Sequence, residues 1–211
     1  PLAVALRAAA GAASLLMLAR FGALSMRALL LLLVFLALPS FAGEQEIEVS
    51  VREVGDTFIV EANFQAPVRA RTAWDVLVDY EHMASIMSNM ESSKIASRNG
   101  NTLIVKQSGV ARFGIFSYAF QVEREIRLEP MKRILTKNLS GSLKRMESEV
   151  MLTSASQESS VRIVYHGEFV FGSTLAGLFA QSFLRHEVEE QFQALVAEMR
   201  RREAQPLAGT Q

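Results

Sequence analysis

Apolar and polar residues alternate along much of the chain after residue 45, which is the pattern of β-strands that bury one face. The first such stretch, residues 46–66, alternates on both sides of Gly55-Asp56. Gly and Asp at this position favour a tight turn, so the stretch predicts two antiparallel strands joined as a hairpin. Pro67 cannot donate to a strand ladder and is expected to end the hairpin.

Residues 68–90 change to the three- and four-residue spacing of amphipathic helices. The second half of this stretch is rich in methionine. We therefore expect two short helices here, with Ala70, Ala73, Trp74, Val76, Leu77 and Tyr80 as the apolar positions of the first, and Met83, Ile86, Met87 and Met90 as those of the second.

Alternation then returns and continues to residue 171. Asn99-Gly100 predicts a type I′ turn between two strands. Three further strands are expected at residues 132–140, 144–155 and 159–171, the last with Val161, Ile163, Tyr165 and Phe169 inward. Residues 116–128 form the clearest strand, with Phe116, Tyr118, Phe120, Val122, Ile126 and Leu128 on one face and polar side chains on the other.

After Gly172 the apolar period becomes 3.6 residues, which predicts one long helix. Ser173 or Thr174 can cap its start, and the cations at 200–202 suit the negative end of the helix dipole. Its apolar stripe comprises Leu175, Leu178, Phe179, Phe183, Val188, Phe192, Leu195, Val196 and Met199, and its solvated side comprises His186, Glu187, Glu189 and Glu190.

These elements predict an α+β fold in which an antiparallel sheet packs against one long helix. No internal repeat and no linker divides residues 43–203, so a single domain is expected. Residues 204–211 are expected to form a disordered tail.

Residues 26–42 carry a second kind of pattern, that of a secretory signal peptide. Arg27 is followed by an apolar run at 28–38, which is shorter than the roughly 20 residues of a membrane-spanning helix. Small residues at Ser40 and Ala42 suit a cleavage site. We therefore expect translation to start at Met26, cleavage after Ala42 and export to a periplasm, with an uncleaved membrane anchor or a longer signal as the alternatives.

Composition narrows the possible partners and chemistry. The chain has 22 basic and 22 acidic residues, and residues 1–42 hold three arginines and no acid, so 19 basic and 22 acidic residues remain after cleavage, a net charge of −3. A mildly acidic domain has no excess of cations for a phosphate backbone, so nucleic acid is not an expected partner. The chain has no cysteine, which excludes disulfides and thiol catalysis.

The order of two strands, two short helices, six strands and a terminal helix resembles the polyketide cyclase / coenzyme Q-binding START-like superfamily, also called SRPBCC. The resemblance covers about Phe58 to Glu203, and its most similar segments are residues 66–90, 140–152 and 183–202. It implies a helix-grip fold, in which the sheet curls around the terminal helix and leaves an apolar cavity for a lipid, isoprenoid, quinone or polyketide.

The resemblance also implies where ligand-binding residues would lie. Met83, Met87 and Met90 fall in the segment expected to overhang the cavity, and flexible thioether chains adapt to variable ligands. The faces predicted for the strands and the long helix add Phe120, Tyr165, Phe179 and Phe183. The alternative for all seven residues is ordinary core packing.

Arg124 interrupts the apolar face of the 116–128 strand, between Val122 and Ile126. A guanidinium on a buried face needs a carboxylate, carbonyl groups or a polar ligand, so Arg124 is a candidate for binding a ligand head group. The alternatives are a β-bulge that turns it outward, or an acidic partner near the sheet edge.

The only histidines, His82, His166 and His186, lack the spacing of a metal site, and no GxSxG nucleophile motif occurs. We therefore expect no metal, no cofactor and no catalytic residue. The favoured interpretation is an exported protein that binds a hydrophobic small molecule in its cavity. The alternatives are a cyclase or aromatase, which the family includes, and a module that binds a protein or lies near a membrane. The sequence does not determine an oligomeric state.

Overall fold

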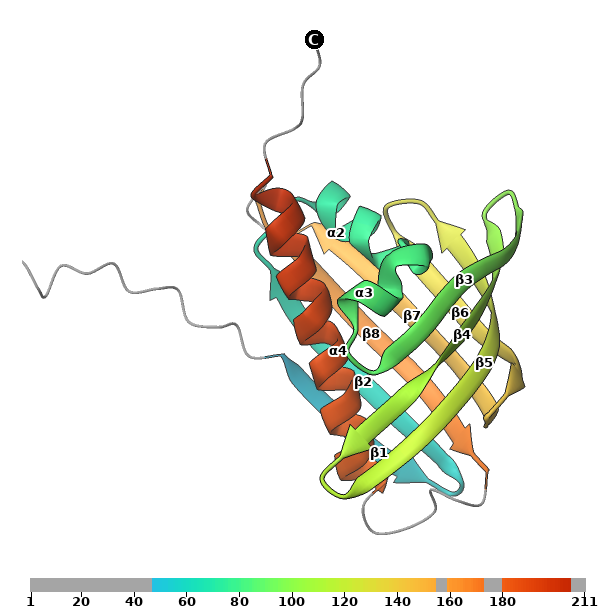
Figure 1. Cartoon of the computed structure of the whole chain (residues 1–211). Coiled ribbons are helices and arrows are strands. Elements are labelled where there is room, and N and C mark those ends of the chain that lie inside the picture. The colour runs from blue at the N-terminus through green and yellow to red at the C-terminus, as the bar shows by residue number, and fades with distance from the viewer. Residues whose placement is uncertain (1–46, 155–158, 173–179, 206–211) are drawn as a thin grey trace, which may run out of the picture. The chain divides into compact units, whose positions relative to one another are not determined.

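The computed structural model describes residues 47–154, 159–172 and 180–205, which belong to one compact unit spanning Gln45–Gln211 (Figure 1). Eight strands form one antiparallel sheet in the order β1-β2-β8-β7-β6-β5-β4-β3, and the long helix α4 lies across its concave face. The strands are β1 (Glu48–Val54), β2 (Thr57–Ala66), β3 (Met90–Asn99), β4 (Thr102–Phe113), β5 (Phe116–Glu129), β6 (Arg133–Gly141), β7 (Leu143–Ser154) and β8 (Val161–Phe171). The predicted α+β, helix-grip fold is confirmed.

The first hairpin has the predicted strands and turn, since Val54 pairs with Thr57 across Gly55-Asp56. The second hairpin differs from its prediction. Asn99 pairs with Thr102, so the two turn residues are Gly100 and Asn101. Gly100 has a φ of 57°, whereas Asn101 does not have a positive φ. A type I′ turn needs a positive φ at both positions, so the type I′ prediction is wrong: the register shifts the turn by one residue and places Gly at its first position.

Between β2 and β3 the chain forms α2 (Ala70–Leu77), the 3₁₀ turn η1 (Tyr80–His82) and α3 (Met83–Ile86). The predicted apolar positions bury Ala73, Trp74, Val76 and Leu77 in α2, and Tyr80 and Met83 after it. These short elements cover the open side of the sheet beside α4 (Figure 1).

β5 keeps the predicted alternation along its described length, and Val122 and Ile126 are buried on its inner face. A bulge does occur beside Arg124, but it lies on the neighbouring strand. Glu123 pairs with Ser140 and Arg124 pairs with Asn138, so Leu139 of β6 is the extra residue and is 49% exposed. Because the bulge is on β6, Arg124 stays on the inner face of β5.

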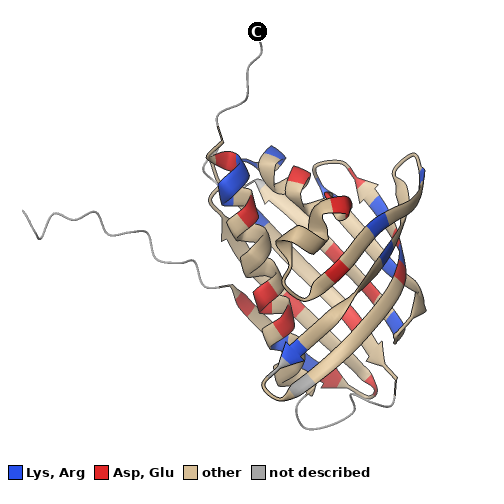
Figure 2. Cartoon of the chain, viewed as in Figure 1, with Lys and Arg blue, Asp and Glu red and all other residues tan. Residues whose placement is uncertain are grey.

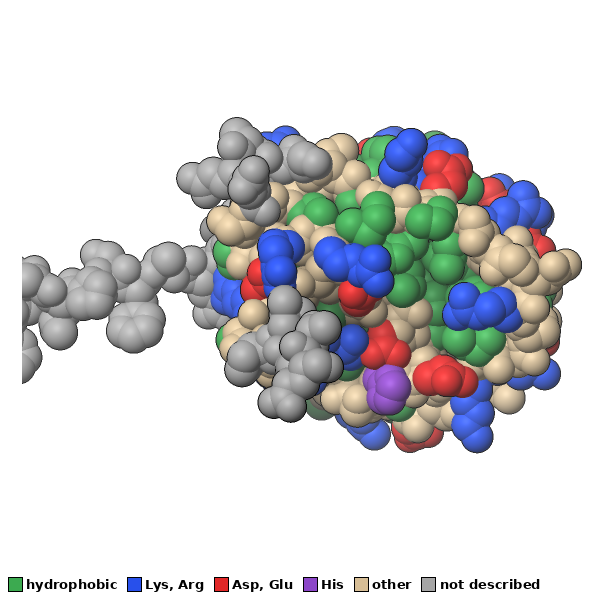
Figure 3. Space-filling model, turned by 90° about the horizontal axis from the view of Figure 1, so that it is seen from above, with side chains coloured by type: hydrophobic (Ala, Val, Ile, Leu, Met, Phe, Trp, Pro, Cys, Tyr) green, Lys and Arg blue, Asp and Glu red, His purple; other side chains and the backbone are tan. Residues whose placement is uncertain are grey.

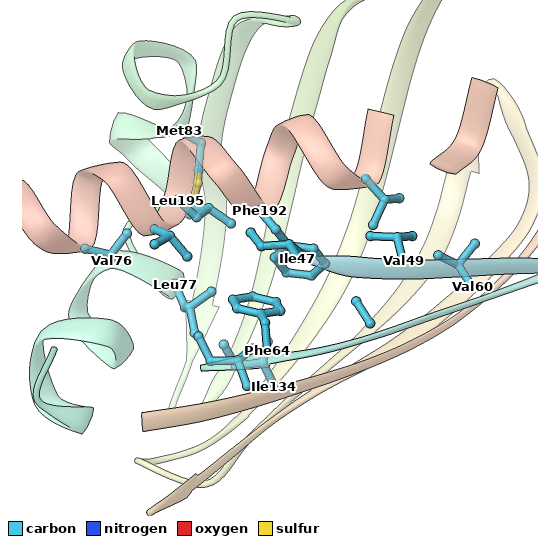
Figure 4. Close-up of a cluster of buried hydrophobic side chains, with 14 of the residues drawn as sticks. Ile47, Val49, Val60, Phe64, Val76, Leu77, Met83, Ile134, Phe192 and Leu195 are labelled. Atoms are coloured by element: carbon cyan, nitrogen blue, oxygen red, sulfur yellow. The ribbon is translucent and has the colours of Figure 1, made fainter. Parts of the chain in front are cut away.

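Helix α4 (Ala180–Glu203) packs its apolar stripe onto the sheet. Val188, Phe192, Leu195, Val196 and Met199 are all buried, as predicted. Figure 4 shows Phe192 and Leu195 facing Phe64 of β2, and the rings of Phe64 and Phe192 have centroids 5.0 Å apart. The residues predicted for the start of this helix, including Phe179, lie outside the described residues.

Polar contacts fix the C-terminal end of α4 to the α2–η1 region. Arg202 donates to Asp79 at 2.7 Å and to Glu198 at 2.6 Å, and Arg69 donates to Glu203 at 2.7 Å. Hydrogen bonds from Arg201 and Arg202 lower the pKa of Glu198 to about 2, although partial burial opposes them. No helix in the described ranges is long and apolar enough to cross a bilayer.

Met199 provides a test of the helix-to-sheet packing, because its side chain is 0% exposed whereas Met151 is 38% exposed. Met199→Ala should lower the free energy of unfolding by about 2–5 kcal/mol, because it leaves a cavity. Met151→Ala, the matched control, should change it by less than about 0.5 kcal/mol. Chemical denaturation measures both, and equal losses would contradict the packing described.

Candidate functional site

A cavity of about 230 Å³ lies between the inner face of the sheet and helix α4. It extends from Leu77 and Ile134 at one end of the domain to Tyr118 and Phe171 at the other. An apolar void of about 150 Å³ in a protein core is enough to bind benzene, so this cavity has room for a larger organic molecule.

The walls of the cavity are largely apolar and come from α4, the α3 region and the central strands. Seven of the eight residues predicted from sequence line it: Met83, Met87, Met90, Phe120, Arg124, Tyr165 and Phe183. The eighth, Phe179, lies outside the described residues. The upper end of the domain, which includes α2, shows hydrophobic side chains gathered near its centre with charged side chains around them (Figure 3).

Arg124 is the cation of the cavity wall. Its Nη1 donates to Oε1 of Gln107 at 3.0 Å, and Gln107 in turn donates to Ser93 at 3.1 Å. Its Nε is sealed from solvent without a partner, and among the described residues Nη2 has no hydrogen-bond partner and no carboxylate lies within ion-pair distance. Burial lowers the pKa of Arg124, and the nearby Tyr165 and Tyr80 oppose that shift. Neither sequence alternative for Arg124, an outward turn or an acidic partner, is therefore found.

Two tyrosines line the same cavity as Arg124. Burial raises the pKa of Tyr165 to about 12, opposed by a hydrogen bond with Ser148, and burial also raises the pKa of Tyr80. Both hydroxyls therefore stay protonated at neutral pH and can donate a hydrogen bond. Gly167 makes room for Tyr165, because a Cβ at position 167 would lie 2.4 Å from the Tyr165 hydroxyl oxygen.

A second polar group of the cavity wall was missed by sequence analysis. Glu187 of α4, predicted on the solvated side, is only 4% exposed. Its Oε2 accepts from Nδ2 of Asn89 at 2.6 Å, and its Oε1 accepts from the backbone N–H of Arg112 at 3.1 Å. Oδ1 of Asn89 is buried without a partner. The spacing did contain a signal, because Glu187 follows the buried Phe183 by four residues and precedes Val188 on the same stripe.

Burial raises the pKa of Glu187, and nearby Glu190 adds to the shift, whereas the hydrogen bonds from Asn89 and Arg112 and the charge of His186 oppose it. A carboxyl group with a raised pKa in the folded state stabilises the fold most when it is protonated, and that contribution is lost as the pH rises through the folded pKa.

The three histidines lie away from the cavity lining. His82 contacts Asp79 at 2.7 Å, His166 lies 3.6 Å from Glu61 and 3.7 Å from Glu168, and His186 lies 3.7 Å from Glu190. Their side chains are 44–70% exposed. Within the described ranges no group of three or more His, Asp or Glu side chains is arranged to hold a metal ion.

Residues 66–196 match the family model described as "Polyketide cyclase / dehydrase and lipid transport". The protein belongs to this family. The resemblance to the START-like, SRPBCC superfamily is thereby confirmed, and members of the family generally bind hydrophobic small molecules. No curated protein matches the chain.

Solved structures support the fold of this family member. The Zhui aromatase/cyclase from Streptomyces sp. R1128 superposes with a TM-score of 0.60 and 19% identity, over 73% of this chain and 99% of the other. A protein from Thermus thermophilus gives 0.61 and 15%, over 69% and 99%. A START superfamily protein from Mycobacterium smegmatis gives 0.60 and 11%, over 68% and 97%.

Glu187→Gln tests the buried carboxyl group. The amide keeps an acceptor for the Arg112 N–H, and its new N–H group can donate to the unpaired Oδ1 of a rotated Asn89. Because the raised pKa makes the ionised carboxylate costly, the stability of the variant relative to the original protein should increase as the pH rises above about 4.3, the ordinary Glu value. Denaturation curves between about pH 4 and pH 8 measure this. Glu189→Gln is the control, and a pH-independent difference for Glu187→Gln would contradict the assignment.

Proposed function

We propose that this protein binds a hydrophobic small molecule in the cavity between the sheet and α4, and that Arg124 contacts a polar head group of that molecule. The observation that carries the proposal is a cation on an otherwise largely apolar cavity wall that has no acidic partner among the described residues. A buried charge is costly unless it is paired, so a ligand that brings oxygen atoms or a negative charge to Arg124 gains more than a purely apolar one.

The shape of the cavity defines the ligand class further. Methionines 83, 87 and 90 contribute flexible side chains to one wall, and the tyrosines at 80 and 165 add hydroxyl donors near Arg124. A lipid, an isoprenoid or a quinone-like molecule with an oxygen-bearing head suits this distribution.

A polyketide cyclase or aromatase activity is the second candidate. It is favoured by Arg124 together with the buried Glu187, since both line the cavity and are of the types that polarise carbonyl groups or move protons. The Zhui neighbour is named as an aromatase/cyclase, but at 19% identity it supports the fold only. Conversion of a polyketide substrate by the purified protein, abolished in Glu187→Gln, would favour this candidate over simple binding.

The ligand can be sought directly in residues 43–211 purified under mild conditions. Native mass spectrometry should show a mass above that of the denatured chain, and extraction should release an apolar molecule of that mass difference. A native mass equal to that of the chain, in samples mixed with total lipid extract, would contradict the proposal.

The role of Arg124 is tested by Arg124→Met, with Arg127→Met as a matched control on the opposite face of β5. Arg127 is 67% exposed and pairs with Glu125 at 2.8 Å. Arg124→Met should weaken binding of a fluorescent fatty acid by about tenfold, the typical value of a charge-assisted hydrogen bond, while the thermal midpoint stays equal or rises. Arg127→Met should change neither quantity, and a stability loss in Arg124→Met with unaltered affinity would make Arg124 purely structural.

We also propose that the protein is exported, on the strength of the signal-like pattern at residues 26–42. Expression of the gene in a bacterial host should give a mature chain that begins near Gly43 in the periplasmic fraction. N-terminal sequencing measures this, and a chain that begins at or before Met26 in the membrane fraction would show an uncleaved anchor instead.

A further inference from the structure

The lower end of the domain in Figure 1 carries an unusual concentration of exposed apolar side chains. Here lie the β1–β2 turn, the β4–β5 hairpin, the β6–β7 turn and the start of α4. Of the four large apolar side chains that are exposed in the described structure, three belong to this end: Val54 at 56%, Ile115 at 94% and Leu139 at 49%. Large apolar side chains that gather at one end mark an interaction surface more often than scattered ones do.

Ile115 is the most exposed of the three and lies at the tip of the β4–β5 hairpin. Phe113 pairs with Phe116, so Gly114 and Ile115 alone form the turn, and Gly114 has a φ of 58°. The sequence of the tip, Arg-Phe-Gly-Ile-Phe, is more apolar than a solvated turn requires. An apolar tip of this kind is short enough to enter only the outer layer of a bilayer.

Exposed cations surround this tip. Arg112 precedes it on β4, Lys144 is an exposed bulge residue at the start of β7, and Arg185 is exposed near the start of α4. None of the three has a carboxylate within ion-pair distance among the described residues, whereas the nearby Arg145 lies 3.8 Å from Glu168. Figure 2 shows Lys and Arg side chains at the hairpin and beside the start of α4. Their charge is complementary to a surface that carries negative charge.

The acidic residues of this end lie on another turn. Glu53 and Asp56 belong to the β1–β2 hairpin, at the far edge of the sheet order from β4 and β5. The end of the domain is therefore basic and apolar on the β4–β5 side and acidic on the β1–β2 side. Contact with an anionic surface would place the β4–β5 hairpin against it and the β1–β2 turn away from it.

The cavity reaches the same end. Tyr118, two residues after the hairpin tip, lines the cavity and donates to the backbone carbonyl of Ser142 at 2.9 Å. Its ring lies 6.3 Å from that of Phe171, which also lines the cavity. A surface bound at the hairpin tip is thus adjacent to the lower end of the cavity.

We propose that the β4–β5 hairpin docks this protein onto an anionic lipid bilayer, with Ile115 in the interfacial layer and Arg112, Lys144 and Arg185 facing lipid phosphates. A bilayer fits better than a protein partner because the apolar part is a single narrow tip with dispersed cations around it, rather than a broad flat patch. The proposal does not depend on which molecule fills the cavity, and it holds whether the cavity serves binding or catalysis.

The test uses residues 43–211, which contain the compact unit and lack the apolar N-terminal run. Co-sedimentation is measured with vesicles of phosphatidylcholine alone and of phosphatidylcholine with phosphatidylglycerol. The protein should bind the anionic vesicles and bind the neutral ones more weakly. Ile115→Asp should lower the partition coefficient by at least about tenfold, the value of one large apolar side chain, and Lys144→Glu should lower it by about fivefold or more on anionic vesicles only.

Met151→Asp is the matched control, because Met151 is exposed on the half of β7 that pairs with the start of β6, far from the hairpin tip. It should leave binding unchanged, and Ile115→Trp should strengthen binding because Trp favours the bilayer interface. Thermal midpoints of all variants should agree, since the substituted side chains are exposed. Absence of vesicle binding, or equal losses in Ile115→Asp and Met151→Asp, would overturn the proposal.

Light scattering after size-exclusion chromatography separates a second occupant of the tip. A monomer is expected for the original protein and for Ile115→Asp. A dimer that Ile115→Asp converts to a monomer would make the hairpin an interface between two copies and would also overturn the proposal. A ligand adduct in mass spectrometry without vesicle binding would leave the proposed function standing and remove this inference alone.

Discussion

A single helix cannot fill the concave face of an eight-stranded sheet, and this packing constraint creates the site. Protein interiors are otherwise packed as densely as organic crystals, so a void of about 230 Å³ is an exception. At about 24 cal/mol per Å³, leaving it unfilled costs on the order of 5 kcal/mol. The buried stripe of α4 and the contacts of Arg202 and Glu203 hold the helix across this space. A ligand that fills the cavity would recover part of that cost.

Polar groups then give the cavity its chemical character. Arg124 and the tyrosines at 80 and 165 supply donors at one place, and the Asn89–Glu187 pair supplies buried oxygen atoms at another. Each group is positioned by strand or helix geometry: Arg124 by the alternation of β5, and Glu187 by the apolar stripe of α4. The cavity is therefore better suited to an amphipathic organic molecule than to a plain hydrocarbon.

Much of this arrangement could be predicted from sequence, and the failures have physical reasons. Alternation placed Arg124 on the inner face of β5, but it could not show that the expected bulge would fall on Leu139 of the next strand. Glu187 was misplaced because acidic residues on a helix are usually solvated, and its partners, Asn89 and the Arg112 N–H, are distant in sequence. The second turn was wrong because strand pairing, rather than the Asn-Gly dipeptide, sets the register. That the cavity stays open between well-packed elements depends on sheet curvature, which no local pattern reports.

The most direct test of ligand binding is methyl NMR of residues 43–211 with labelled methionines, titrated with a long-chain fatty acid and separately with a hydrophobic quinone. Methionines 83, 87 and 90 line the cavity, whereas Met151 is exposed on β7 and does not. Saturable shifts of the three cavity methyl groups, with Met151 unchanged, are the result that this account predicts for at least one of the two compounds. Shifts at Met151 alone, or no saturable shift with either compound, would contradict a ligand-binding cavity beneath α4.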